Sequence, residues 1–202
     1  MNILKRNMVK SLVFTLVVLL IIPSHSQAET KTAYFAGGCF WCTEADFEKI
    51  DGVKDVISGY MGGHVANPTY DKISTGLTGH RETVKVVYDD ELISYSHLLD
   101  AFWRMHDPTD GTGSFVDRGF QYSSAIYTSD ANEISLINKS IEKLTAEKKY
   151  PKPIVTVIEP AAPFYVAEDH HQDYYKKEPY RYTYYRYRSG RDAHILEYWG
   201  NE

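Results

Sequence analysis

The sequence has few of the residues on which several protein classes depend. Only two of its 202 residues are cysteine, Cys39 and Cys42, which excludes a disulfide-stapled scaffold and a four-cysteine zinc site. It has no excess of positive charge, since 22 basic residues face 27 acidic ones and the formal net charge is −5. Such a chain has no electrostatic basis for holding a phosphate backbone, so we expect no nucleic-acid partner. The eight histidines show no metal-ligand spacing, and we expect no metal site.

The remaining composition is that of an ordinary folded protein. With 43% hydrophobic and 24% charged residues, a chain of this length forms one domain or two small ones. No linker rich in proline, glycine or serine follows residue 29, and no repeat is visible. We therefore expect a single domain over residues 29–202.

The first 28 residues have the order of a secretory signal peptide. Lysine and arginine residues between positions 5 and 10 precede an uncharged stretch, 11–22, and small residues then lead to Ala28. The stretch is shorter than the roughly 20 apolar residues that a bilayer span needs. We expect cleavage after Ala28 and export to the periplasm or the extracellular space, with no stable membrane span afterwards. The alternative is a membrane anchor that stays uncleaved.

The hydrophobic pattern predicts an α+β domain with the order β-α-β-β-α-β, typical of the split β-α-β plait, or ferredoxin-like core, with a mixed or antiparallel sheet. A longer helix, a further strand and a tyrosine-rich C-terminal tail follow, and we expect the tail to wrap the core. The predicted strands are 32–36, 53–60, 83–88, 122–128 and 154–158, and the predicted helices are 43–50, 96–105 and a segment from about 130 toward 148, capped by Ser129 or Asp130.

The two cysteines lie where the first strand gives way to the first helix. A thiol at a helix N-terminus has its thiolate favoured by free backbone N–H groups and by the helix dipole, so Cys39 is a candidate nucleophile. Cys42 follows one helical turn later and can attack a group formed on Cys39. The alternative is a structural disulfide, although a bridge that closes so short a loop stabilises a fold little.

Seven sequence motifs follow one another along the chain. Together they resemble the A-type peptide methionine sulfoxide reductases, in a subtype with a Cys-Phe-Trp-Cys active-site pair, and the similarity extends from residue 33 to about 182. The motifs are Gly-Cys-Phe-Trp (38–41), Gly-Tyr-Met-Gly-Gly-His (59–64), Asn-Pro-Thr-Tyr (67–70), Thr-Gly-His-Arg-Glu (78–82), Phe-Trp-Arg-Met-His-Asp-Pro (102–108), Asp-Arg-Gly-Phe-Gln-Tyr-Ser-Ser-Ala-Ile-Tyr (117–127) and Pro-Phe-Tyr-Val-Ala-Glu-Asp-His-His-Gln (163–172).

The resemblance implies an activity and a role for each matched residue. The family reduces the S epimer of methionine sulfoxide, free or in proteins, by thiolate attack on the sulfoxide sulfur, which leaves a sulfenic acid on the cysteine. Cys39 matches the nucleophile, and Glu82 matches the group that donates a proton to the oxygen, which requires burial to raise its pKa. The other matches are Tyr70 and Tyr122 as hydrogen-bond donors to the oxygen, Asp117 near the cysteine, Phe40 and Trp41 as the wall for the S-methyl group, and, more weakly, Tyr174 and Tyr182 at the same pocket.

Recycling of the enzyme is expected to depend on Cys42. Residues 182–202 contain no cysteine, so Cys42 is the expected resolving residue, and its disulfide with Cys39 would be reduced by thioredoxin or a thioredoxin-like protein. This external thiol replaces any bound cofactor, and we expect a monomer. We assign no catalytic role to residues 187–191 of the tail.

Two other functions fit parts of the sequence. An exported thiol-disulfide oxidoreductase commonly carries Cys-x-x-Cys at a helix start, although two strands in succession after the first helix argue against that fold. A binding module could hold peptides through its tyrosine- and arginine-rich tail. Each single site residue also has a structural alternative: Glu82 as a residue flanking its strand, Asp117 as a turn residue, and Tyr70 and Tyr122 as core tyrosines.

Overall fold

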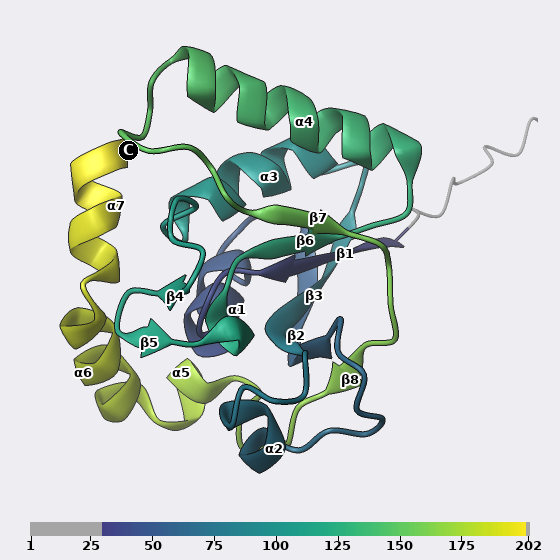
Figure 1. Cartoon of the computed structure of the whole chain (residues 1–202), viewed down its shortest axis with the longest axis vertical. Helices are drawn as coiled ribbons and strands as arrows, with labels where there is room; N and C mark the ends of the chain where they lie inside the picture. The colour runs from purple at the N-terminus through teal and green to yellow at the C-terminus, as the bar shows by residue number, and fades with distance from the viewer. Residues whose placement is uncertain (1–29, 201–202) are drawn as a thin grey trace, which may run out of the picture.

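A computed structural model describes residues 30–200, in which helices pack around a six-stranded mixed sheet (Figure 1). The expected signal peptide, residues 1–28, lies outside the described residues. No helix within 30–200 combines the length and the apolar character needed to cross a membrane.

The strand order of the main sheet is β7-β6-β1-β3-β2-β8. Neighbouring strands are antiparallel except β6 and β7, which are parallel, so the predicted mixed sheet is confirmed. Because β3 lies between β1 and β2, the β1-α1-β2 unit is split. The strands are β1 Thr30–Ala36, β2 Val53–Met61, β3 Arg81–Asp89, β6 Ala125–Tyr127, β7 Val157–Glu159 and β8 Tyr165–Val166, with β4 Gly113–Ser114 and β5 Asp117–Arg118 forming a separate pair.

The helices lie around this sheet (Figure 1), with α3 against α4, and with α6 and α7 along one side of the molecule. Side-chain caps fix two of their starts: Ser94 accepts from the His97 amide, and Asp130 accepts from the two amides that follow Ala131. The helices are α1 Phe40–Phe47, α2 Tyr70–Ser74, α3 Tyr95–Arg104, α4 Ala131–Ala146, α5 Tyr174–Lys177, α6 Pro179–Ser189 and α7 Arg191–Trp199, and Phe120–Tyr122 forms a 3₁₀ turn.

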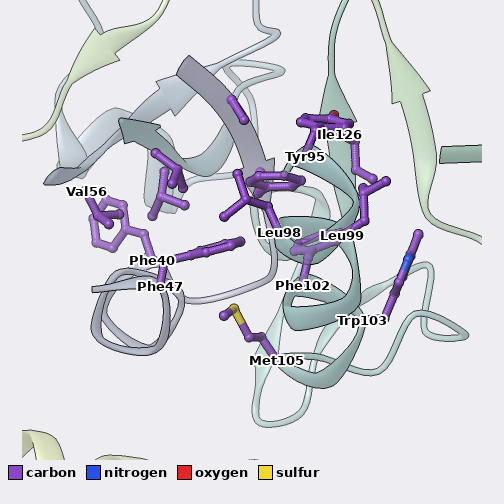
Figure 2. Close-up of a cluster of buried hydrophobic side chains, with 14 of the residues drawn as sticks. Phe40, Phe47, Val56, Tyr95, Leu98, Leu99, Phe102, Trp103, Met105 and Ile126 are labelled. Atoms are coloured by element: carbon purple, nitrogen blue, oxygen red, sulfur yellow. The ribbon is translucent and has the colours of Figure 1, made fainter. Parts of the chain in front are cut away.

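The core between α1, α3 and the sheet is largely aromatic. Figure 2 shows Phe40 and Phe47 of α1 facing Phe102 of α3 across this space. The Phe35 ring of β1 lies between the helices, with its centroid 5.0 Å from that of Phe47 and 4.9 Å from that of Phe102. Each such side chain contributes about 1.5–3 kcal/mol when fully buried. The packing fixes α1 on the sheet and thereby fixes the position of Cys39 at its start.

Three segments differ from the predicted elements. The predicted strand 122–128 shortens to β6 because the chain turns at Gly119, whose φ of +123° suits glycine, into the 3₁₀ turn. The predicted strand 154–158 lies slightly later, as β7. The C-terminal tail is helical: Pro179 occupies the start of α6, and Gly190 in the left-handed conformation separates α6 from α7.

Candidate active site

Cys39 is the N-cap residue of α1, as the sequence predicted, and is 5% exposed. The turn before it requires glycine, because Gly38 has a φ of +88° and a Cβ there would lie 2.3 Å from the Ser114 Cβ. After it, the amide and the hydroxyl of Thr43 each donate to the Cys39 carbonyl at 3.3 Å. The turn and the first helical residues therefore hold the thiol in one place.

Glu82, on β3, lies against the start of α1. Its Oε2 accepts a 2.9 Å hydrogen bond from the Phe40 amide, and its side chain is buried. Burial raises the pKa of this carboxyl to about 8, against the opposing effect of the Phe40 hydrogen bond. At neutral pH the group is therefore mostly a neutral acid, which can donate a proton.

Tyr70 and Tyr122 lie far apart in sequence, and both line the same pocket. Glu168 fixes the first turn of α2, because its carboxylate accepts 2.8 Å hydrogen bonds from the Tyr70 amide and from the Tyr60 hydroxyl. Burial raises the pKa of both Tyr70 and Tyr122, so both phenols stay protonated and can donate.

Asp117 lies on β5 and accepts a hydrogen bond from the Tyr185 hydroxyl. Burial raises the pKa of Asp117, although this hydrogen bond acts in the opposite direction. The Tyr185 ring meets Trp41 edge-on, at 5.8 Å between centroids and 85°. The sequence did not single out Tyr185; its only signal was the density of tyrosines in the tail, which does not say which of them faces the pocket.

These side chains line one narrow pocket of about 40 Å³. A pocket of this size suits a small terminal group. Seven of the predicted site residues and Tyr185 come together here. The lining residues are Cys39, Phe40, Trp41, Tyr70, Glu82, Asp117, Tyr122 and Tyr185.

Tyr174 and Tyr182, which the resemblance placed at the pocket, do not line it. Tyr174 stacks on the Trp41 ring with the centroids 3.7 Å apart, and His171 Nδ1 accepts a 3.1 Å hydrogen bond from the Trp41 indole. Tyr182 packs in one buried cluster with Cys42. The two tyrosines, from α5 and α6, thus pack against Trp41 and Cys42 of α1.

Both cysteines are free thiols and both are buried. Burial and the hydrogen bond with Cys42 raise the pKa of Cys39 well above its ordinary value, which is opposite to the favoured thiolate expected at a helix start. The same hydrogen bond lowers the pKa of Cys42 to about 7, assisted by the charges of Arg191 and Arg186. Desolvation at Cys39 therefore opposes the effect of the helix N-terminus.

The described residues offer no metal centre: within 30–200, no three histidine, cysteine or acidic side chains converge where an ion could bind. The polar groups of the pocket are thiol, carboxyl and phenol groups. Together they can hold and protonate an oxygen beside an attacking sulfur.

Comparison with known proteins gives the same picture across the chain. The family model described as "Peptide methionine sulfoxide reductase" matches residues 31–202. The chain is 48% identical to the peptide methionine sulfoxide reductase MsrA of Halalkalibacterium halodurans, over 86% of this chain and 99% of that protein. It is 46% identical to the MsrA/MsrB protein of Vibrio cholerae over 91% of this chain, and there it spans 52% of the relative's length.

Solved structures agree with these relatives. Reduced Mxr1 from Saccharomyces cerevisiae matches with a TM-score of 0.70 and 32% identity, over 76% of this chain and 88% of that one. The structure of Mxr1 in complex with Trx2 matches with a TM-score of 0.50 and 27% identity, over 73% and 86% of the two chains. The fold, the pocket and the relatives agree, and the chain belongs to the peptide methionine sulfoxide reductase family.

Proposed function

We propose that this oxidoreductase reduces methionine-S-sulfoxide, free or in proteins, with Cys39 as the nucleophile. The observation that carries the proposal is the buried Glu82 carboxyl, held 2.9 Å from the amide of the residue that follows the nucleophile. A buried acid with a pKa of about 8 beside a thiol suits a reaction in which an oxygen gains a proton while its sulfur is attacked.

The first step converts thiol and sulfoxide into sulfenic acid and methionine. Cys39 Sγ forms a bond to the sulfoxide sulfur, and Glu82 protonates the oxygen as negative charge develops there. The hydroxyl group then passes to Sγ. As the Sγ–O bond forms, the bonds from the methionine sulfur to oxygen and to Sγ break, and one electron pair stays on the methionine sulfur as methionine leaves. The thiol proton of Cys39 returns to the Glu82 carboxylate, so the step consumes no external proton. Tyr70 and Tyr122 donate hydrogen bonds to the same oxygen.

The aromatic walls select the group that enters. Phe40 and Trp41 line the pocket beside Cys39 and provide an apolar surface for the S-methyl group. The narrow volume excludes larger substituents at the sulfur. The backbone and the rest of the substrate stay outside, which is compatible with both free and protein-bound methionine sulfoxide.

Cys42 is the proposed resolving residue. It follows Cys39 by one helical turn, its amide donates to the Cys39 carbonyl at 3.2 Å, and burial among aromatic rings shields it from solvent. Its attack on the sulfenic acid gives a Cys39–Cys42 disulfide and water.

A thioredoxin-like dithiol is the proposed reductant of that disulfide. The relative Mxr1 has been solved in complex with Trx2, and the reduced form of Mxr1 matches this chain over most of its length. This partner supplies two electrons per cycle, and no bound cofactor takes part.

We also propose that the protein acts after export, as one mature domain over residues 29–202. The support is the order of basic, apolar and small residues before Ala28. Mass spectrometry of the N-terminus of the protein from its native host tests this. A peptide beginning at Glu29 is expected, and an intact residue 1 would support the anchored alternative.

An assay with racemic methionine sulfoxide peptide and dithiothreitol tests the activity. The expected result is consumption of the S epimer alone. The competing function, disulfide exchange, is tested in parallel by reduction of insulin disulfides. Insulin reduction without sulfoxide consumption would overturn the proposal, and the family relationship already disfavours it.

A further inference from the structure

Arg191 is a buried cation that the proposed mechanism does not use. It is the first residue of α7, and its side chain is 0% exposed. It ends the segment 187–191, to which the sequence assigned no catalytic part. A fully buried guanidinium is costly unless hydrogen bonds and a counter-charge surround it, so the groups around it decide how its charge is balanced.

The hydrogen bonds of Arg191 go only to neutral groups. Nη1 donates to the Met105 carbonyl, and both Nη atoms lie 3.5 Å from the Gly37 carbonyl. Its Cζ lies 5.0 Å from the centroid of the Phe115 ring. Nε is buried and has no hydrogen-bond partner, and among the residues from 30 to 200 no carboxylate forms a salt bridge with this guanidinium.

The nearest backbone is the turn that carries the nucleophile. A Cβ placed on Gly38 would lie 3.4 Å from Arg191 Nη2. The guanidinium therefore lies against the Gly37-Gly38 turn from which the helix of the two cysteines begins. The charges of Cys42, Asp46 and Cys39 raise the pKa of Arg191 against the effect of its burial.

Several charged or titratable groups act on Cys42, and within residues 30–200 one cation among them, Arg191, forms no salt bridge. Arg186 is matched by acids, because Nη1 lies 2.7 Å from Asp46 and Nε lies 2.8 Å from Asp192. Arg191 is the cation near Cys42 that no acid in the described part of the chain pairs directly. The groups are Cys39 and Asp46 from the start and middle of α1, Glu82 from β3, Tyr182, Tyr185 and Arg186 from α6, and Arg191 from α7.

We propose that Arg191 is a positioning residue whose charge stabilises the Cys42 thiolate during recycling of the enzyme. The inference rests on the resolving role of Cys42 in the proposed function. In the resolving step, Cys42 Sγ attacks the sulfur of the Cys39 sulfenic acid, so that the S–S bond forms and the S–O bond breaks. The leaving hydroxide takes up the proton that Cys42 released and departs as water. Cys42 is anionic when this step begins.

The same charge acts when the disulfide is reduced. Cys39 is 5% exposed and Cys42 is 0% exposed, beneath Tyr174 and Tyr182, so the incoming thiolate reaches Cys39 Sγ. A mixed disulfide forms on Cys39, the electron pair of the broken S–S bond goes to Cys42, and Cys42 leaves as a thiolate. A cation beside the leaving sulfur favours this direction of attack.

Titration of Cys42 in the Cys39→Ser background tests the inference without any activity measurement. The readout is the ¹³Cβ resonance of labelled Cys42 against pH. Adding Arg191→Met should reduce the thiolate population at a given pH by at least tenfold, whereas Arg191→Lys should retain most of it. Arg188→Met, which removes an exposed arginine of α6, is the matched control and should leave the titration unchanged.

Kinetics then connect the titration to the reaction. In otherwise intact enzyme, Arg191→Met should slow disulfide formation after the first methionine at least tenfold more than it slows methionine formation itself. It should also shift the dithiol–disulfide equilibrium about tenfold toward the disulfide, which is about 30 mV. With Arg191→Lys, both the rate of disulfide formation and the dithiol–disulfide equilibrium should stay close to those of the native enzyme.

The outcomes separate this inference from the proposed function. An unchanged Cys42 titration in Arg191→Met overturns the inference whatever the activity. An altered titration in an enzyme that forms no methionine would instead overturn the proposed function. If Arg191→Met does not fold, the guanidinium ¹³Cζ resonance of Arg191 in the native protein decides: it should titrate with Cys42 and lose that titration in Cys42→Ser. A resonance independent of Cys42 overturns the inference.

Discussion

The Phe40 amide donates a 2.9 Å hydrogen bond to Glu82 Oε2, and this contact joins the proton donor to the helix of the nucleophile. Phe40 is the first residue of α1 and Cys39 is its cap, while Glu82 lies on the central strand β3. The distance between acid and thiol is therefore set by the packing of α1 on the sheet. Glu82 is thus held by a strand, and Cys39 by the turn and the helix that follow β1.

Glu82→Gln should slow formation of the first methionine by about 10²–10⁴-fold, the usual effect of a lost general acid. The glutamine oxygen can still accept from the Phe40 amide, so substrate affinity should change little. Rapid-quench measurement of one turnover checks this. Glu133→Gln is the control, because Glu133 is another carboxyl whose pKa burial raises, on α4 outside the pocket. A Glu82→Gln rate within twofold of the native rate would remove the assignment.

The pKa of Glu82 also predicts that relative stability and rate both fall with rising pH, but in different pH ranges. Its folded-state pKa of about 8 exceeds the ordinary value, so folding favours the protonated form. This stability is fully present below the unfolded pKa and is lost as the pH rises toward 8. Relative to Glu82→Gln, the native protein should lose about 1.4 kcal/mol per pH unit between roughly pH 5 and 8.

Urea denaturation of the native protein and Glu82→Gln at several pH values measures the difference in their free energies of unfolding. Single-turnover experiments measure how the reaction rate depends on pH. Above about pH 8 the native rate should fall tenfold per unit as the acid form disappears. A stability difference that is independent of pH would show that Glu82 is ionised throughout this range.

Cys42→Ser should still produce about one methionine per enzyme and then stop, with sulfenic acid retained on Cys39. Cys39→Ser should produce none, because it lacks the attacking sulfur. Methionine is counted by chromatography, and sulfenic acid is trapped with a dimedone probe. Full turnover of Cys42→Ser with thioredoxin would mean that the reductant resolves the sulfenic acid directly.

The sequence predicted the pocket from residues whose roles follow from short motifs. Cys39 was identified because a glycine turn before a helix can be located from local pattern, whereas Glu82 was identified only by the resemblance of its motif to the family. Their environment could not be predicted in the same way. Burial by segments distant in sequence raises the pKa of Cys39, an effect opposite to that of the helix start, and local pattern could not predict it.

The C-terminal part was the least predictable. Its tyrosines and arginines follow no simple apolar period, and the helices α5, α6 and α7 depend on contacts with α1 and the core. Tyr174 stacks on the Trp41 ring and Tyr185 meets it at 85°, yet their sequence contexts are alike. Only the packing shows that Tyr185 lines the pocket and that Tyr174 supports its wall.

Tyr174→Ala should raise KM more than it lowers kcat, because Trp41 loses the ring stacked on it at 3.7 Å. An aromatic pair contributes about 0.5–1.5 kcal/mol beyond its buried area, which corresponds to a rise of about 2–10-fold. Tyr174→Phe keeps the stack and should behave as the native enzyme. Steady-state kinetics with dithiothreitol distinguish the two. Equal KM values for both variants would show that Trp41 keeps its position without the stack.

Gly38→Ala should destabilise the turn that carries Cys39 for two separable reasons. The φ of +88° is unfavourable for alanine, and the new Cβ would overlap Ser114 at 2.3 Å. Gly190→Ala is a matched control, because Gly190 has a φ of +82° but a Cβ added there would meet no atom within 4 Å. Urea denaturation should give a loss of about 1–3 kcal/mol for Gly190→Ala and a larger loss for Gly38→Ala.

Adding Ser114→Gly to Gly38→Ala should remove the overlapping atoms. The free energy of unfolding should then recover by the amount by which the loss in Gly38→Ala exceeds the loss in Gly190→Ala. The backbone part of the loss should remain. Single-turnover rates should fall in Gly38→Ala and recover with the double variant, because the position of the thiol depends on the same turn. Losses that are equal for Gly38→Ala and Gly190→Ala would mean that β4 moves aside, and the turn would then owe its shape to glycine's φ alone.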